Sequence, residues 1–181
     1  MRNIVDATNR LVGTSRALLV LARAEAGVEP PRLEVVRLEP LLREALGSSA
    51  PAGCEITIAC PPSLQTLVDP ELLVLALSAL CDNACRHSRG TPVRVEVAEL
   101  EQGTRLAIDV VSADVGTRSR DELDRLAVRF VSGEGRDSGG FGIGLSIAER
   151  ATRLIGGRLV LWSGDGQLRV GLHLAAVGTV A

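Results

Sequence analysis

The feature that most constrains the fold is an alternation of two hydrophobic periods along the chain. Apolar residues recur at every second position in short segments, as in strands, and at spacings of three or four in longer ones, as in helices. The strand-like segments are 33–38, 54–60, 93–97, 106–110, 159–162 and 168–174, and the helix-like segments are 39–46, 70–87, 121–129 and 143–155. Because helices and hairpin-like connections both join the strands, we predict an α/β fold: a two-layer sandwich of a mixed sheet with helices on one face.

Two of the predicted helices carry clear boundary signals. Asp69 followed by Pro70 is an N-cap residue with proline in the first helical position. Gly156 and Gly157 follow the last predicted helix, where a glycine ends a helix readily.

One long amphipathic helix is predicted to precede this sandwich, over residues 3–25, with a length of about 33 Å. Its apolar stripe follows i+4 and i+7 spacings and consists of Ile4, Val5, Leu11, Val12, Leu18, Leu19 and Ala22. Gly27 and Pro30-Pro31 end the helix. The helix either folds onto its own domain or forms half of an intermolecular bundle. The heptad spacing and the hinge at 27–32 favour the second interpretation.

Composition excludes several classes of function. Apolar residues make up 46% and charged residues 23%, the mix of a domain that can bury a core. The aromatic residues are only Phe130, Phe141 and Trp162, which disfavours binding of single-stranded nucleic acid by base stacking. The net charge of -2 leaves no basic footprint for a duplex, so we expect no nucleic-acid partner.

The longest apolar run, 72–81, is far shorter than the roughly 18 residues of a membrane span. The first ten residues lack the apolar stretch of a signal peptide, so we expect no membrane span and a cytoplasmic location. Disulfides are rare there, and we therefore predict that all four cysteines are buried thiols. With only two histidines in the chain, a zinc site shared by Cys81 and Cys85 is disfavoured.

The glycine-rich stretch GGFGIGLSIAE, residues 139–149, is the first candidate for chemistry. Gly140, Gly142 and Gly144 stand at alternate positions where a helix begins, so bare backbone can approach an anion at the positive helix end. This pattern predicts a phosphate cradle, although it is neither a Walker A loop nor a dinucleotide fingerprint. A plain glycine-rich surface loop is the alternative.

The second candidate is DNACRHS, residues 82–88, near the end of the central helix. Asn83, Arg86 and His87 share one helical face. An amide oxygen is a hard ligand that suits Mg²⁺, and Arg86 beside it can pair with phosphate. Asp82 points about 100° away, which disfavours its direct participation. The alternative is a polar outer face of an otherwise buried helix.

The third candidate, Asp114-Val115-Gly116, follows the strand that ends near residue 111. A carboxylate there can accept a hydrogen bond from the amine of adenine, and Gly116 lets a base approach the backbone. An Asx turn explains the same residues.

Taken in order, these segments resemble the carboxy-terminal part of sensor histidine kinases over nearly the whole chain. The order is LLVLARAEAG at 18–27, DNACRHS, DVG at 114–116, Arg129-Phe130, GGFGIGLSIAE, and GGRLVLWS at 156–163. The resemblance implies the Bergerat ATP-binding fold, which DNA gyrase and heat-shock chaperones share, with ATP and Mg²⁺ as ligands. It also implies that residues 1–26 are the second helix of a dimerisation and histidine-phosphotransfer hairpin, 27–32 a hinge, and 33–181 the catalytic domain.

The resemblance further assigns roles to single residues. Asn83 is assigned to Mg²⁺, and Asn83 and Arg86 to catalysis. The residues 131–139 correspond to the ATP lid. The nucleotide contacts implied are Asn83, Arg86, His87, Asp114 for the adenine amine, Gly116, Arg136 for the γ-phosphate, and Gly140, Gly142, Gly144 and Leu145 around the phosphates.

The chain departs from the family pattern at several positions. Arg118 replaces the second glycine of the adenine-side motif, Ala79 replaces an asparagine, and Ala127 replaces a phenylalanine. Neither His87 nor His173 has the context of the family's phosphoacceptor.

We therefore expect a histidine kinase that transfers the γ-phosphoryl of ATP to a histidine supplied in trans. The partners implied are a histidine-bearing dimerisation-domain protein and, downstream, a response regulator. The alternatives are a serine kinase of the anti-sigma type and a non-catalytic ATP-binding regulatory protein.

Overall fold

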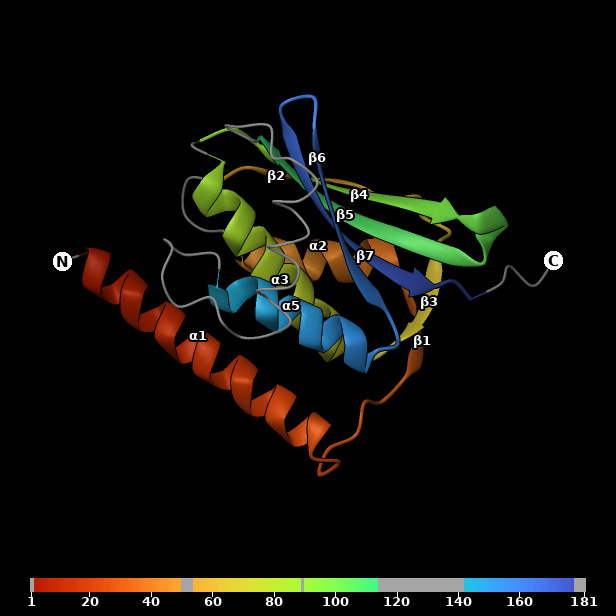
Figure 1. The fold of residues 1–181 in the computed structure, drawn as a ribbon, viewed down its shortest axis with the longest axis horizontal. Coiled ribbons are helices and arrows are strands. Elements are labelled where there is room, and N and C mark those ends of the chain that lie inside the picture. The colour runs from red at the N-terminus through yellow and green to blue at the C-terminus, as the bar shows by residue number, and fades with distance from the viewer. Residues whose placement is uncertain (1, 50–53, 89, 114–141, 178–181) are drawn as a thin grey trace.

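A five-stranded mixed sheet forms one layer of the protein (Figure 1). The computed structural model describes residues 2–49, 54–88, 90–113 and 142–177. The strands run in the order β2 (Ile56–Ala59), β4 (Val93–Leu100), β5 (Arg105–Ala113), β7 (Gln167–Ala175) and β6 (Arg158–Gly164). β2 is parallel to β4 and the other pairs are antiparallel, so the predicted mixed sheet is confirmed.

Alternation along these strands decides which side chains enter the core. The register aligns Val97 of β4 with Ile108 of β5, and Ile108 with Leu172 of β7, and all three are buried. Trp162 is 44% exposed, so the core of the described residues is built from aliphatic side chains.

A second, two-stranded sheet pairs β1 (Glu34–Arg37) with β3 (Gln65–Val68) in antiparallel register. β1 lies inside the predicted strand 33–38. β3 was not predicted, because polar Thr66 faces the interior and apolar Leu67 is exposed, so its apolar residues do not alternate.

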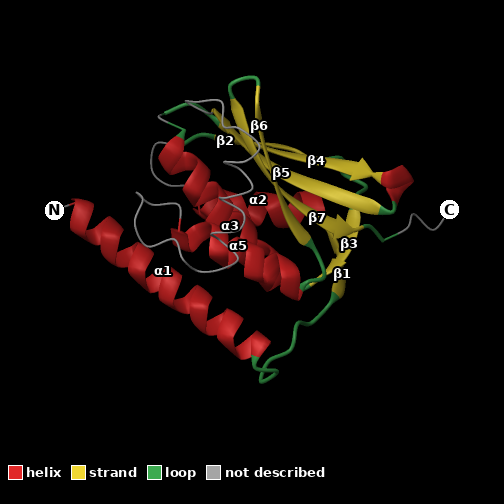
Figure 2. Ribbon diagram, viewed as in Figure 1, coloured by secondary structure: helices red, strands yellow, loops and turns green. Residues whose placement is uncertain are grey.

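Helices α2 (Leu38–Ser49), α3 (Pro70–His87) and α5 (Gly142–Leu154) form the second layer, against one face of the sheet (Figure 2). A short 3₁₀ turn, η1 (Glu101–Gly103), joins β4 to β5. The predicted helix 121–129 and the glycine-rich residues up to 141 lie outside the described residues.

The predicted ends of α3 and α5 are confirmed. Asp69 caps α3, where its Oδ1 accepts a hydrogen bond from the backbone N–H of Leu72 at 3.1 Å. Its Oδ2 accepts another from the backbone N–H of Arg32 at 2.7 Å, which holds the segment before β1 against the start of α3. After α5, Gly156 has a φ of +76°, and the Gly157 N–H donates to the Thr152 carbonyl at 2.9 Å.

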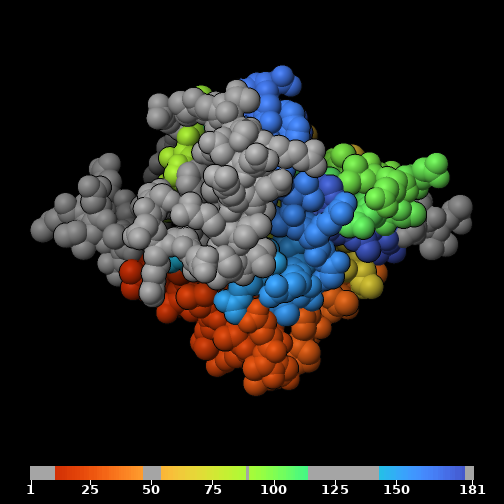
Figure 3. Space-filling model, in the orientation of Figure 1, coloured from red at the N-terminus to blue at the C-terminus, as the bar shows by residue number. Residues whose placement is uncertain are grey.

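Helix α1 (Arg2–Glu25) packs against α5 at one edge of the molecule (Figure 3). Ala17 and Leu21 are buried in this contact, and the Glu25 carboxylate pairs with Arg150 of α5, with Nε at 2.9 Å from Oε1. The Arg150 guanidinium lowers the pKa of Glu25 below its ordinary value.

The predicted apolar stripe lies on a different face of α1. Its members for which side chains are described are exposed: Leu11, Val12, Leu18, Leu19 and Ala22. The helix thus has two apolar faces, of which one contacts its own domain and the other does not. No described helix is both long and apolar enough to cross a membrane.

The prediction of four buried thiols is wrong for three cysteines, because two form a disulfide and Cys60 is only half-buried. Cys54, just before β2, and Cys85, in the last turn of α3, form a disulfide with their Cα atoms 5.7 Å apart. Cys60 and Cys81 are free, and burial raises the pKa of Cys81 to about 12. The local pattern placed Cys81 and Cys85 on α3 correctly, whereas Cys54 and Cys60 flank β2 instead of lying within it. It could not show that the start of β2 lies beside the end of α3.

Candidate functional site

The first turn of α5 lies directly against the middle of α3. A Cβ added at Gly144 would lie 3.4 Å from the carbonyl oxygen of Ala79 and 4.0 Å from the Cβ of Asn83. The absence of a side chain at Gly144 therefore allows close approach of the two helices. Two of the predicted site residues, Asn83 and Gly144, come together at this contact although they are far apart in the sequence.

The side chain of Asn83 is buried, with 4% of its surface exposed. The alternative of a polar outer face is therefore wrong for this residue, because α5 packs over it. Its Oδ1 accepts no hydrogen bond from any residue that the structure describes. Such an atom costs free energy in the folded state, so an unpaired buried amide oxygen indicates a ligand position.

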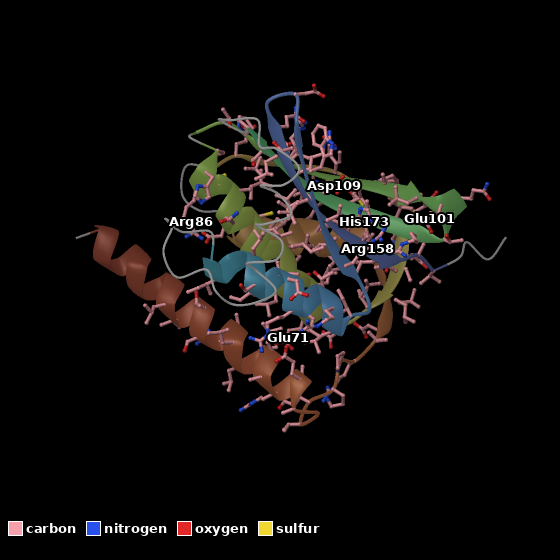
Figure 4. The ribbon with its side chains drawn as sticks, in the orientation of Figure 1. Glu71, Arg86, Glu101, Asp109, Arg158 and His173 are labelled. Carbon is pink, nitrogen blue, oxygen red and sulfur yellow. A yellow bond between two sulfur atoms is a disulfide. The ribbon has the colours of Figure 1, made fainter. Side chains whose placement is uncertain are left out.

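Arg86 lies one turn beyond Asn83 and forms an ion pair with Asp82 on the same helix (Figure 4). From its angle on the helix, Asp82 was expected not to contact the ligand directly. In the structure its carboxylate orients the Arg86 guanidinium. The guanidinium is partly exposed and can reach an anion in solution. His87, the last residue of α3, is half-buried.

The beginning of α5 offers backbone donors. Residues 142–145 form its first turn, whose N–H groups have no acceptor within the helix, and the helix dipole adds positive potential there. Gly142 and Gly144 lie in this turn as predicted. The Leu145 side chain is in the core, with 2% of its surface exposed, so only its backbone is available to a ligand.

Several predicted site residues lie outside the described part of the chain: Asp114, Gly116, Arg136 and Gly140. β5 ends at Ala113, which agrees with the prediction that a strand directly precedes Asp114. Their roles stay predictions.

A separate charged group lies on the open face of the sheet, away from Arg86 (Figure 4). Arg169 Nη1 lies 2.9 Å from Glu96 Oε2 and 3.8 Å from Asp109 Oδ2, and its guanidinium carbon is 5.9 Å from the centroid of the Trp162 ring. Burial raises the pKa of Asp109 and lowers that of His173. These charges compensate one another, so we interpret the group as structural.

The Asn83 site fits a magnesium nucleotide. Within the described segments, no three side chains of His, Cys, Asp or Glu are grouped to hold a metal ion. Mg²⁺ does not need such a cage, because it binds through one or two protein oxygens together with substrate phosphates and water. One unpaired amide oxygen beside the N-terminus of a glycine-containing helix meets this requirement. The fold and site together define a nucleotide-binding protein.

Comparison with known proteins agrees with this class. Residues 68–177 match the family described as histidine kinase-, DNA gyrase B- and HSP90-like ATPases, and the chain belongs to this family. It carries an ATP-binding catalytic domain of the histidine-kinase type.

Two curated relatives come from Mycobacterium tuberculosis. A probable sensor histidine kinase HK is 33% identical over 159 residues, which cover 87% of this chain and 41% of the relative. The sensor-like histidine kinase SenX3 is 29% identical over 166 residues, covering 87% of this chain and 40% of the relative. The chain thus spans about two fifths of the length of these relatives.

Solved structures share the fold. The full-length protein ShkA, solved in complex with AMPPNP, superposes with a TM-score of 0.74 at 23% identity, covering 97% of this chain and 38% of ShkA. The mycobacterial sensor histidine kinase MprB gives a TM-score of 0.64 at 19% identity, covering 80% of this chain and 98% of that structure. The predicted fold class is therefore confirmed.

Proposed function

We propose that this chain binds ATP with Mg²⁺ and transfers the γ-phosphoryl group to a histidine on a partner polypeptide, from which a response regulator would receive it. The observation that carries the proposal is the buried Oδ1 of Asn83 beside Gly144, which has no partner among the described residues, in a chain of the histidine-kinase ATPase family.

In this proposal Asn83 holds Mg²⁺ through its amide oxygen, and the ion when bound neutralises charge on the phosphate oxygens. Arg86, oriented by Asp82, pairs with the nucleotide, and the first turn of α5 donates backbone N–H groups to phosphate. Asp114 and Arg136 are proposed to contact the adenine amine and the γ-phosphate. The bond between the β–γ bridging oxygen and the γ-phosphorus breaks, a bond to an imidazole nitrogen forms, and ADP leaves. Such a transfer depends mainly on positioning and charge neutralisation.

The second apolar face of α1 supports an acceptor in trans. Leu11 is 76% exposed and Leu19 is 53% exposed, while the opposite face already contacts α5. An amphipathic helix from another polypeptide can cover this stripe, as in a helical bundle.

The test is incubation with γ-labelled ATP and Mg²⁺, first of the chain alone and then with a helical-hairpin protein that carries a candidate histidine. We expect acid-labile label on the partner's histidine only. Label on this chain alone would contradict transfer in trans, label on a partner serine would indicate the serine-kinase alternative, and ATP binding without any transfer would indicate a regulatory protein.

Two variants distinguish the role of the proposed Mg²⁺ ligand from the role of the exposed apolar face of α1. Asn83→Ala should lower transfer by more than about 100-fold, since loss even of groups that only support a metal ligand costs about 10–100-fold. Leu18→Glu should prevent transfer to the partner but leave ATP binding unchanged. Gly13→Glu is the matched control, because it adds the same charge to α1 at an exposed position with no atom within 4 Å of the added Cβ.

A further inference from the structure

The disulfide between Cys54 and Cys85 lies next to the proposed nucleotide site. Cys85 is two residues beyond Asn83 and directly precedes Arg86 in the last turn of α3. The bond joins this turn to the chain entering β2, 31 residues earlier in the sequence. Both cysteines are half-buried, so small thiols can reach them.

Several hydrogen bonds at this end of α3 join residues that are close in the sequence. The Thr91 N–H and the Thr91 hydroxyl both donate to the Ser88 carbonyl, at 3.0 and 2.6 Å. The Ser88 N–H donates to the Ala84 carbonyl at 2.8 Å, and the Ser88 hydroxyl donates to the Cys85 carbonyl at 3.0 Å. Both of these bonds are local to the helix end. The disulfide is therefore the covalent attachment of this turn to the sheet, and it reaches the edge strand, since β2 pairs only with β4 in the sheet order.

We propose that Cys54 and Cys85 are a reversible thiol–disulfide site, and that the oxidised form orders the last turn of α3 and so strengthens nucleotide binding. This effect rests on the proposed function, because it acts through Asn83, Arg86 and His87. The reaction partner is a low-molecular-weight disulfide or thiol, such as oxidised or reduced glutathione.

The disulfide forms from the two thiols by two successive thiol–disulfide exchange steps. One cysteine thiolate attacks the external disulfide, forms a mixed disulfide and releases one external thiolate. The second cysteine thiolate then attacks the protein sulfur of the mixed disulfide and releases the other. Two electrons pass from the protein sulfurs to the external disulfide, and the two protons pass through solvent to the released thiolates.

The two remaining cysteines form no disulfide with each other or with this pair. Cys81 is buried, and burial raises its pKa to about 12, which leaves almost no thiolate near neutral pH. Cys60 is half-buried, lies just beyond the far end of β2, and is free. It therefore provides a matched control for Cys54, because the two cysteines flank the same strand.

The experiment holds the purified chain in glutathione buffers of different redox ratio. Alkylation under denaturing conditions followed by mass spectrometry counts free thiols, and calorimetry measures affinity for ATP with Mg²⁺. We expect four free thiols in the reduced protein and two in the oxidised one, with Cys54 and Cys85 in one linked peptide. If the turn is formed in about a third of reduced molecules, the apparent Kd rises about threefold on reduction.

Two variants sharpen the result. Cys54→Ser should bind ATP like the reduced protein in every buffer, whereas Cys60→Ser should keep the full redox response. Thermal unfolding of each variant checks its fold, and the reduced wild-type protein gives the same comparison should Cys54→Ser not fold.

Four free thiols at every redox ratio, or equal affinity in both states, would overturn the proposal. Absence of ATP binding in both states would overturn the effect on affinity together with the proposed function. The thiol count would still decide independently whether the bond forms.

Discussion

Replacing Asn83 by leucine should stabilise the ligand-free protein and at the same time abolish nucleotide binding. The amide is buried and its Oδ1 has no described partner, so the folded protein carries an unpaired polar atom that an apolar side chain would remove. Leucine branches at the same carbon as asparagine. Stability and function are therefore expected to change in opposite directions at this position, as at other binding sites that conflict with folding.

The magnitude follows from three contributions. Removing an unpaired buried polar group gains about 1–3 kcal/mol, and the higher helix propensity of leucine gains about 0.5 kcal/mol. The bulkier side chain opposes these gains by about 1 kcal/mol through overpacking. The net gain of about 1–2 kcal/mol corresponds to a rise in Tm of about 3–6 °C for a chain of this size.

The assay is thermal unfolding followed by circular dichroism, without nucleotide and with ATP and Mg²⁺ at about a hundred times Kd. The wild-type protein should gain about 2.7 kcal/mol from the ligand, and Asn83→Leu should gain nothing. Thr152→Val is the control, because the Thr152 hydroxyl is equally buried but donates to the Ala148 carbonyl at 2.6 Å. This control should lose about 1 kcal/mol and keep the ligand response. A destabilised Asn83→Leu that still responds to the ligand would refute the reasoning.

Three further perturbations test the contacts that hold α3 and α5, the two helices that carry the proposed site. Arg150 lowers the pKa of Glu25, so the carboxylate stabilises the fold above its ordinary value of 4.5, and this contribution is lost as pH falls through the lower folded-state value. Glu25→Gln should therefore cost about 0.5 kcal/mol at neutral pH, after allowance for solvent screening, and nothing in strong acid, as measured by urea midpoints. Gly157→Ala should cost about 2 kcal/mol, because its Cβ would lie 2.5–2.9 Å from three atoms, whereas Gly13→Ala, with open space, should gain about 1 kcal/mol in the same urea titration. Asp69→Ala should cost about 1 kcal/mol through loss of the N-cap, and an unchanged thermal midpoint would contradict the role given to this carboxylate.

The fold was predictable where the local pattern was long enough to show its period. Apolar residues alternate over 93–97 in β4, 106–110 in β5 and 168–174 in β7, and the ends of α3 and α5 follow from Asp69-Pro70 and Gly156-Gly157. β3 was missed because Thr66 is buried while Leu67 is exposed, which breaks the alternation of apolar residues.

The contacts within the site were not predictable from local pattern. The residue types of Asn83 and Gly144 suggested a metal ligand and a phosphate loop, but only their contact shows that α5 buries the amide. The disulfide was missed for the same reason, because it depends on a tertiary contact between two segments whose local patterns are unrelated.

The hydrogen bond from the Arg32 N–H to the Asp69 carboxylate limits the distance between α1 and the rest of the protein. Helix α1 ends at Glu25, and the backbone N–H of Arg32 donates to the Asp69 carboxylate. Only residues 26–31 therefore connect the end of α1 to this hydrogen bond at the start of α3. In fully extended conformation, this segment spans about 25 Å. If the contact between α1 and α5 were broken, the start of α3 could lie at most about 25 Å from the end of α1. This distance is about the rise of 16 helical residues. The short connection through residues 26–31 therefore limits how far α1 and the start of α3 can separate.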